Sequence, residues 1–183
     1  MTALDKWLQQ QRIRRAISHL PPGAFVLDVG CHQGELLLHP GINISGGVGI
    51  DPLCSQPNTE SIRFIKGAFP QAVPLHLRFD AITALALVEH LPQGQHAPFF
   101  AACAQLLKPN GLVICTVPHA RVDSILHVLT RLRLIKGMSI DEHHGYNVLQ
   151  TPEFAGKAGL HQLKHQPFQL GLNHLFVFQK KPH

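Results

Sequence analysis

The stretch that organises this chain reads Val26-Leu27-Asp28-Val29-Gly30-Cys31-His32-Gln33-Gly34. An apolar run ends there in a turn with two glycines, and glycine tolerates backbone angles and close approaches that other residues resist. Such a turn at the start of a helix also presents free N–H groups to a negatively charged ligand group. The next apolar run, Val48-Gly49-Ile50, ends at Asp51, an acid well placed to bind both hydroxyls of a ribose. The turn and the acid together predict a nucleoside-binding site.

Four parts of the chain resemble class I S-adenosylmethionine-dependent methyltransferases, in the order and at the spacing of that family. Residues 26–34 and 49–51 resemble its first two motifs, and residues 79–91 resemble its fourth strand with the loop that follows. Residues 107–118 resemble the turn and fifth strand of the branch that methylates small molecules. The resemblance covers roughly residues 22–180. It implies an α/β fold that is Rossmann-like: a seven-stranded, mostly parallel sheet with a reversed last strand and helices on both faces.

Hydrophobic patterning locates the elements of such a fold. Strands are expected at residues 25–29, 48–51, 62–66, 81–85, 112–117, 160–166 and 174–179. Helices are expected at residues 1–20, 98–107 and 151–159, with a short one at 35–39. Thr151 is expected to cap the last of these helices. The last strand is apolar on both faces, so we expect it between the fifth and sixth strands and antiparallel to the sixth.

Length and composition fit one globular domain. The chain has 183 residues, of which 45% are hydrophobic, and we expect a single domain over residues 1–183. Residues 119–150 lie where the family usually inserts a helical piece over the substrate pocket, so a substrate cap is expected there. No transmembrane segment is expected, because the longest apolar run, residues 81–88, is far too short to span a bilayer. The charged N-terminus and four cysteines without paired spacing indicate a cytoplasmic protein with reduced thiols.

The family resemblance implies that the cofactor is S-adenosylmethionine and that S-adenosylhomocysteine is the product. Asp51 would hold the ribose, while Asp28 would order the turn and reach the ammonium group of the cofactor through water. The family often has an acid after the third strand that binds adenine, but Ala68 stands there, which removes about 1–2 kcal/mol of binding. The expected cofactor residues are Asp28, Gly30, Cys31, His32, Gly34, Asp51, Pro52, Ala68, Phe69, Leu85 and Ala86.

Two histidines are candidate general bases because they follow strands four and five at the edge where ligands bind in open α/β sheets. His90 could instead pack the loop after strand four, and His119 could be an exposed loop residue. His143, His144 and Tyr146 are candidate substrate contacts, because similar enzymes have their substrate opening near this segment. None of the fourteen histidines forms a helical His-x-x-x-His pair with an acidic partner, so no catalytic metal is expected.

The sequence leaves the acceptor and the oligomeric state open. A net charge of +5 and the basic, apolar segment 121–136 permit an anionic or lipid-linked acceptor, although an ordinary helix with a solvated basic face is the preferred interpretation of that segment. A dinucleotide oxidoreductase is disfavoured, because the turn lacks three-glycine spacing and Tyr146 has no lysine partner four residues later. Nucleic acid is not an expected partner, because there is no dense basic patch. The remaining alternative is a non-catalytic binding or scaffold protein with this fold, which the short helix, His32 and Ala68 favour.

Overall fold

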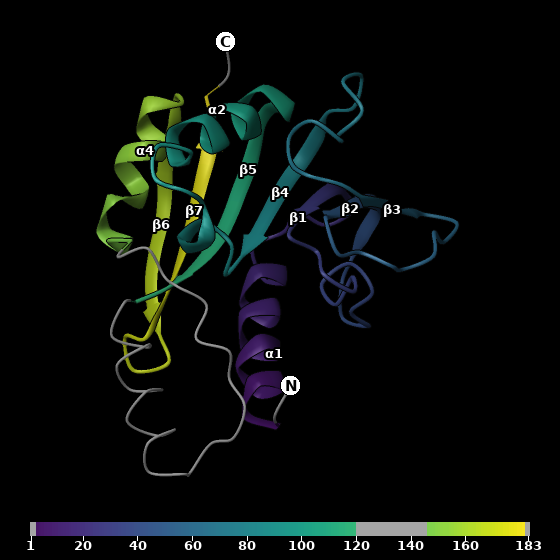
Figure 1. Cartoon of the computed structure of the whole chain (residues 1–183), viewed down its shortest axis with the longest axis horizontal. Coiled ribbons are helices and arrows are strands. Elements are labelled where there is room, and N and C mark those ends of the chain that lie inside the picture. Colours follow the sequence, from purple (N-terminus) through teal and green to yellow (C-terminus); the bar gives the residue numbers. More distant parts are fainter. Residues whose placement is uncertain (1–2, 120–145, 182–183) are drawn as a thin grey trace.

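The computed structural model describes residues 3–119 and 146–181 and contains one seven-stranded sheet (Figure 1). The strands are β1 (Ala24–Val29), β2 (Ile44–Asp51), β3 (Ile62–Lys66), β4 (Phe79–Leu85), β5 (Leu107–Pro118), β6 (Leu160–Phe168) and β7 (Asn173–Lys180). Their order is β3-β2-β1-β4-β5-β7-β6. The first five strands pair in parallel, and β7 is antiparallel to both β5 and β6. The predicted fold class and the predicted position of the last strand are confirmed.

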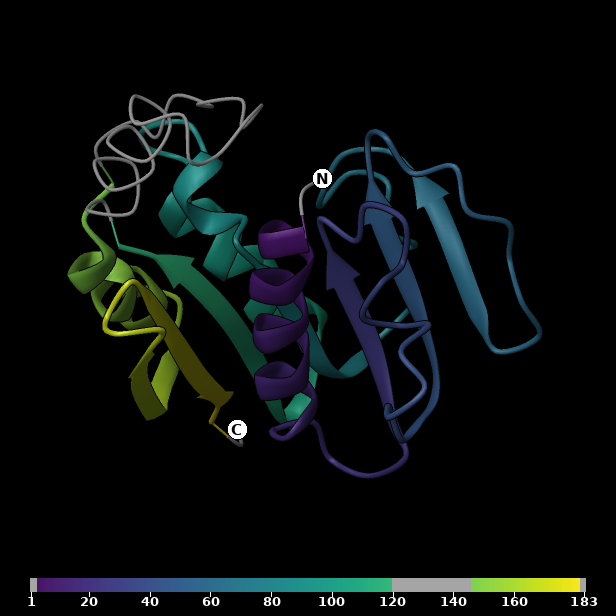
Figure 2. The ribbon, with the colours of Figure 1, turned by 90° about the horizontal axis from the view of Figure 1, so that it is seen from below.

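Helices cover the two faces of the sheet. They are α1 (Ala3–Ile17), α2 (His96–Leu106) and α4 (Thr151–Lys157), with short 3-10 turns η1 (Val88–His90) and η2 (Val148–Gln150). Buried Ile13 and Ala16 pack α1 against one face, and Figure 2 shows this helix crossing in front of the strands. Helices α2 and α4 belong to the core on the other face, which contains Phe176 and Phe178 of β7. None of the described helices is long and apolar enough to cross a membrane.

Several predicted boundaries were wrong. Residues 35–39 form turns rather than a helix, because Pro40 follows before a second helical turn can form. Strand β5 begins at Leu107 rather than 112: the predicted turn at residues 109–111 lies inside it, where the pairing with β4 is irregular and Asn110 has a φ of 61°. Thr151 is the first helical residue rather than the cap, and its hydroxyl donates to the Val148 carbonyl at 2.7 Å.

The parallel strands bring the predicted site residues to one edge of the sheet. The carboxyl ends of β1, β2, β4 and β5 all lie there, since these strands run in the same direction. Strand β1 is the centre of this arrangement, because it pairs with β2 on one side and β4 on the other. The glycine turn that follows β1 therefore lies between the loops after β2 and β4, where ligands bind in open α/β sheets.

Candidate active site

The turn after β1 has an unusual backbone. Gly30 and Gly34 have φ values of 75° and 77°, in the left-handed region that favours glycine. A Cβ atom on Gly34 would lie 2.6 Å from the ring of Phe64, so this glycine is also required for packing against β3. His32 has a φ of 47°, which costs a non-glycine residue about 1 kcal/mol. His32 is therefore a strained residue at a position where the backbone favours glycine.

Asp51 ends β2 and faces the glycine turn. One carboxylate oxygen, Oδ2, accepts a hydrogen bond from the backbone N–H of His32 at 3.1 Å. The other, Oδ1, accepts from the backbone N–H of Leu53 at 2.7 Å. Each oxygen has a further lone pair, and the residue is partly exposed, so the carboxylate can also accept two hydroxyl groups. The two backbone bonds fix the orientation of the carboxylate before any ligand arrives.

Asp28 lies beneath the turn and is only 3% exposed. Its Oδ1 accepts a hydrogen bond of 2.6 Å from the hydroxyl of Thr83 on the neighbouring strand β4. Burial raises the pKa of Asp28 to about 7, and the nearby carboxylates of Glu35 and Asp51 act in the same direction. Burial therefore favours the protonated carboxyl group, whereas a cation bound above the turn would favour the ionised form.

Side chains that the sequence reasoning missed hold the turn in place. The amide oxygen of Gln33 accepts from the hydroxyl of Ser55 at 3.1 Å and from the amide of Gln56 at 3.3 Å, which joins the turn to the loop after β2. Glu35 binds the ring of His32 at 3.0 Å and accepts from the N–H of Gln33 at 3.1 Å. Hydrogen bonding to His32 and Gln33 lowers the pKa of Glu35 despite its partial burial. No periodicity reveals these contacts, since they join side chains of irregular segments.

The predicted adenine end is less complete. Ala68 is exposed and its carbonyl accepts from the N–H of Ala72 at 3.0 Å, while the ring of Phe69 packs on Phe99 with centroids 5.3 Å apart. Pro52 is exposed in the loop after Asp51.

The loop after β4 begins with a strained residue beside the turn. Ala86 follows Leu85 with a φ of 51°, and its N–H donates to the Thr116 carbonyl at 2.8 Å. This bend brings Leu87 over the glycine turn, where its side chain would lie 3.1 Å from a Cβ atom on Gly30. Leu87 thus packs over the turn from the loop after β4, a contact that sequence reasoning did not single out.

The two predicted bases differ in their surroundings. His90 lies in η1 with its side chain 38% exposed, and its Nε2 is 3.8 Å from a carboxylate oxygen of buried Glu89. His119 follows β5 and is half-buried, with its ring 5.8 Å from that of His174. His174 is hydrogen-bonded through Nδ1 to Nε2 of His165 at 2.8 Å. Burial, with the neighbouring histidines His165 and His119, lowers the pKa of His174.

Two of the three predicted substrate contacts, His143 and His144, lie outside the described residues. Tyr146 is 9% exposed and stacks on the ring of His96 at a centroid distance of 4.5 Å. Its hydroxyl is hydrogen-bonded to that of Thr151 at 2.9 Å, and burial raises its pKa. This environment gives Tyr146 a packing role between α2 and α4.

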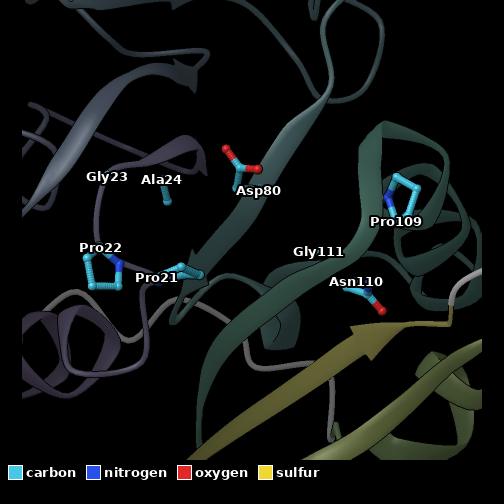
Figure 3. Close-up of a pocket in the computed structure, with 8 residues that line it drawn as sticks. All are labelled: Pro21, Pro22, Gly23, Ala24, Asp80, Pro109, Asn110 and Gly111. Atoms are coloured by element: carbon cyan, nitrogen blue, oxygen red, sulfur yellow. The ribbon is translucent and has the colours of Figure 1, made fainter.

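A hollow of about 330 Å³, shown in Figure 3, lies at the ends of the strands opposite to the glycine turn. It is lined by Pro21, Pro22, Gly23, Ala24, Asp80, Pro109, Asn110 and Gly111. These residues come from the segment before β1, from the amino ends of β1 and β4, and from the start of β5. The hollow is therefore separate from the glycine turn and Asp51, and the chemistry of the side chains, not the presence of a hollow, locates the candidate site.

Residues 5–157 match the sequence model of a family described as "Methyltransferase domain". The chain belongs to this family. The resemblance to class I S-adenosylmethionine-dependent methyltransferases is thereby confirmed, and S-adenosylmethionine is the cofactor of that class. The chain is 29% identical over 150 residues to the ubiquinone biosynthesis O-methyltransferase of Colwellia psychrerythraea, which covers 76% of this chain and 60% of that relative. It is 31% identical over 101 residues to the protein of that name from Rhodopseudomonas palustris, covering 50% of this chain and 39% of the relative.

Solved structures confirm the fold. Magnesium protoporphyrin IX methyltransferase from Synechocystis, solved with S-adenosylhomocysteine, has a TM-score of 0.70 and 16% identity, covering 99% of this chain and 89% of its own. A Burkholderia thailandensis 1,6-didemethyltoxoflavin-N1-methyltransferase, also solved with S-adenosylhomocysteine, has a TM-score of 0.69 and 19% identity. The match covers 97% of this chain and 81% of that enzyme's chain.

The described residues fit most of the cofactor. The left-handed glycines allow close approach to the turn, and the carboxylate of Asp51 has acceptor capacity for two ribose hydroxyls. Asp28 supplies a carboxyl group below the turn that favours a nearby ammonium group when ionised. Only the adenine end lacks an acidic partner, because Ala68 occupies that position.

Proposed function

We propose that this chain transfers a methyl group from S-adenosylmethionine to an oxygen of a small-molecule acceptor. The observation that carries the proposal is Asp51, whose carboxylate is oriented toward the glycine turn by the N–H groups of His32 and Leu53. The chain spans 60% of the length of its Colwellia relative, so the activity is proposed for the residues at hand and not transferred with the name.

The bound cofactor supplies an electrophilic methyl group on a sulfonium. The chain's own residues then have to hold donor and acceptor at near-attack distance and remove the acceptor's proton. Asp51 would fix the ribose, and the backbone from Gly30 to Gly34 would bind the amino-acid end. The alternative of a non-catalytic binding protein is less well supported, since the turn and Asp51 are both intact and hydrogen-bonded.

An oxygen acceptor is favoured because the relatives from Colwellia and Rhodopseudomonas are O-methyltransferases by name. A lipid- or sugar-linked acceptor of this kind is compatible with the charge of +5. The segment 119–150 as a substrate cap and a cytoplasmic location both stay predictions from the sequence.

Calorimetric titration of the purified chain with S-adenosylhomocysteine tests the cofactor half of this proposal. We expect a dissociation constant in the micromolar range, about −8 kcal/mol, because only the adenine acid is missing from the site. S-adenosylmethionine should compete for the same site. Absence of heat with both ligands, from protein whose folding is established by circular dichroism, would contradict the proposal and favour the binding-protein alternative.

His90 is the proposed general base, because it is exposed at the carboxyl edge beside the carboxylate of Glu89. With radiolabelled S-adenosylmethionine and a panel of phenols and catechols, we expect His90→Gln to lower kcat by about 100-fold. Binding of S-adenosylhomocysteine should be unchanged. His119→Gln is the matched control, since it removes the other candidate imidazole at the same edge. Equal activity of the His90 variant and the wild type would remove His90 from the mechanism.

A further inference from the structure

Two cysteines flank the proposed ribose site. Cys31 follows Gly30 in the turn, and its N–H donates to the Ile50 carbonyl at 3.3 Å. Cys54 lies in the loop after β2, and its N–H donates to the Asp51 carbonyl at 3.2 Å. The two cysteine backbones are therefore attached to neighbouring carbonyl groups at the end of one strand.

Both thiols belong to one apolar cluster next to the site. Cys31 and Cys54 are 3% and 5% exposed, and their side chains interact with each other there. Gly49 makes room for the sulfur of Cys31, because a Cβ atom on this glycine would lie 2.9 Å from it. The other two cysteines, Cys103 and Cys115, are buried in the core on the opposite face of the sheet.

We propose that Cys31 and Cys54 are an oxidative modification site that forms a disulfide with a peroxide and thereby weakens cofactor binding. With hydrogen peroxide, two S–H bonds break and one S–S bond forms. The two electrons and two protons released reduce the peroxide to two molecules of water. The effect on the cofactor rests on the proposed function, whereas formation of the disulfide does not.

The two cysteines are each adjacent to a group that orients Asp51. His32 follows Cys31 and Leu53 precedes Cys54, and the N–H groups of His32 and Leu53 are the donors to the Asp51 carboxylate. A disulfide holds its sulfur atoms at covalent distance, closer than two thiols in contact. Its formation must therefore shift the turn and the loop toward each other, and with them the N–H groups that hold the ribose-binding carboxylate.

Binding of the cofactor and oxidation of the two thiols should oppose each other. Burial, together with nearby Asp28 and Cys54, raises the pKa of Cys31, so its thiol stays protonated at neutral pH and reacts slowly in the closed turn. A ligand that binds the reduced site more tightly than the oxidised one must also disfavour oxidation, because the coupling between the two is reciprocal. S-adenosylhomocysteine is thus expected to protect the thiols.

Mass spectrometry after trypsin digestion reads the modification directly, because each cysteine pair lies in a separate peptide. Residues 16–63 carry Cys31 and Cys54, and residues 79–121 carry Cys103 and Cys115, since trypsin does not cleave before Pro109. After treatment of the folded wild type with peroxide, we expect peptide 16–63 to lose two hydrogen atoms while peptide 79–121 is unchanged. An unchanged peptide 16–63, or equal loss in both peptides, would overturn the proposal.

The same oxidised protein tests the consequence for binding. We expect its dissociation constant for S-adenosylhomocysteine to rise about tenfold or more and to recover after treatment with dithiothreitol. In the Cys54→Ser variant, peroxide should leave the dissociation constant unchanged. The control variant Cys103→Ser should behave as wild type. A disulfide that leaves binding unchanged would overturn the coupling. Absence of binding even to the reduced wild type would instead contradict the proposed function, while the peptide masses would still decide whether the disulfide forms.

Discussion

Asp51→Ala is expected to weaken the binding of S-adenosylhomocysteine by about 100-fold. The carboxylate would accept both ribose hydroxyls, and each hydrogen bond to a charged group contributes about 1.5 kcal/mol or more. Loss of two such bonds corresponds to about two powers of ten in the dissociation constant. The measurement is calorimetric titration of variant and wild type under the same conditions.

Asp80→Ala is a matched control for this experiment. The carboxylate of Asp80 also accepts a backbone N–H, from Phe25 at 2.9 Å, and it binds the ammonium group of Lys108 at 2.9 Å. It lies at the opposite edge of the sheet, beside the hollow in Figure 3. We therefore expect the Asp80 variant to bind as the wild type does. Equal binding by the Asp51 variant and the wild type would exclude Asp51 as the ribose anchor.

The sequence sufficed for the topology because the deciding signals were local and strong. The apolar residues on both faces of β7 predicted a strand inside the sheet, and its pairing with β5 and β6 confirms this. The glycine turn followed by Asp51 predicted which strands meet at the site. Both features are patterns of residue type at short spacing, which is the information that a single sequence carries.

The details of the site were not predictable in the same way. The interaction between Cys31 and Cys54 and the hydrogen bond between Thr83 and Asp28 join residues that come together only after the strands pair. The sequence predicts Gly34 as a residue of the ligand turn, and its missing side chain also makes room for Phe64. Such long-range packing leaves no periodic trace in the sequence, so only the structure shows the supporting contacts of the site.

Asp28 should make the stability of the folded chain fall as the pH rises. In the folded state burial raises the pKa of Asp28 to about 7, from its ordinary value of 3.8. Between these two values the folded state keeps a proton that the unfolded chain releases, so stability is fully present below the lower value and is lost as the pH rises through the upper one. Relative to Asp28→Asn, the wild type should lose about 3 kcal/mol of unfolding free energy between pH 5 and pH 8.

Denaturant unfolding of both proteins across this pH range measures the difference. Asparagine keeps an oxygen that accepts from the Thr83 hydroxyl, so the substitution removes the ionisation and retains that hydrogen bond. Asp80→Asn is again the control. Burial alone would raise the pKa of Asp80, but the hydrogen bond from the Phe25 N–H and the charge of Lys108 lower it overall. The stability that Asp80 contributes is therefore lost only as the pH falls through that lowered pKa. A constant difference between wild type and Asp28→Asn from pH 5 to pH 8 would show that Asp28 is ionised throughout. A permanent negative charge would then lie under the glycine turn, and the ammonium group of the cofactor would bind without displacing a proton.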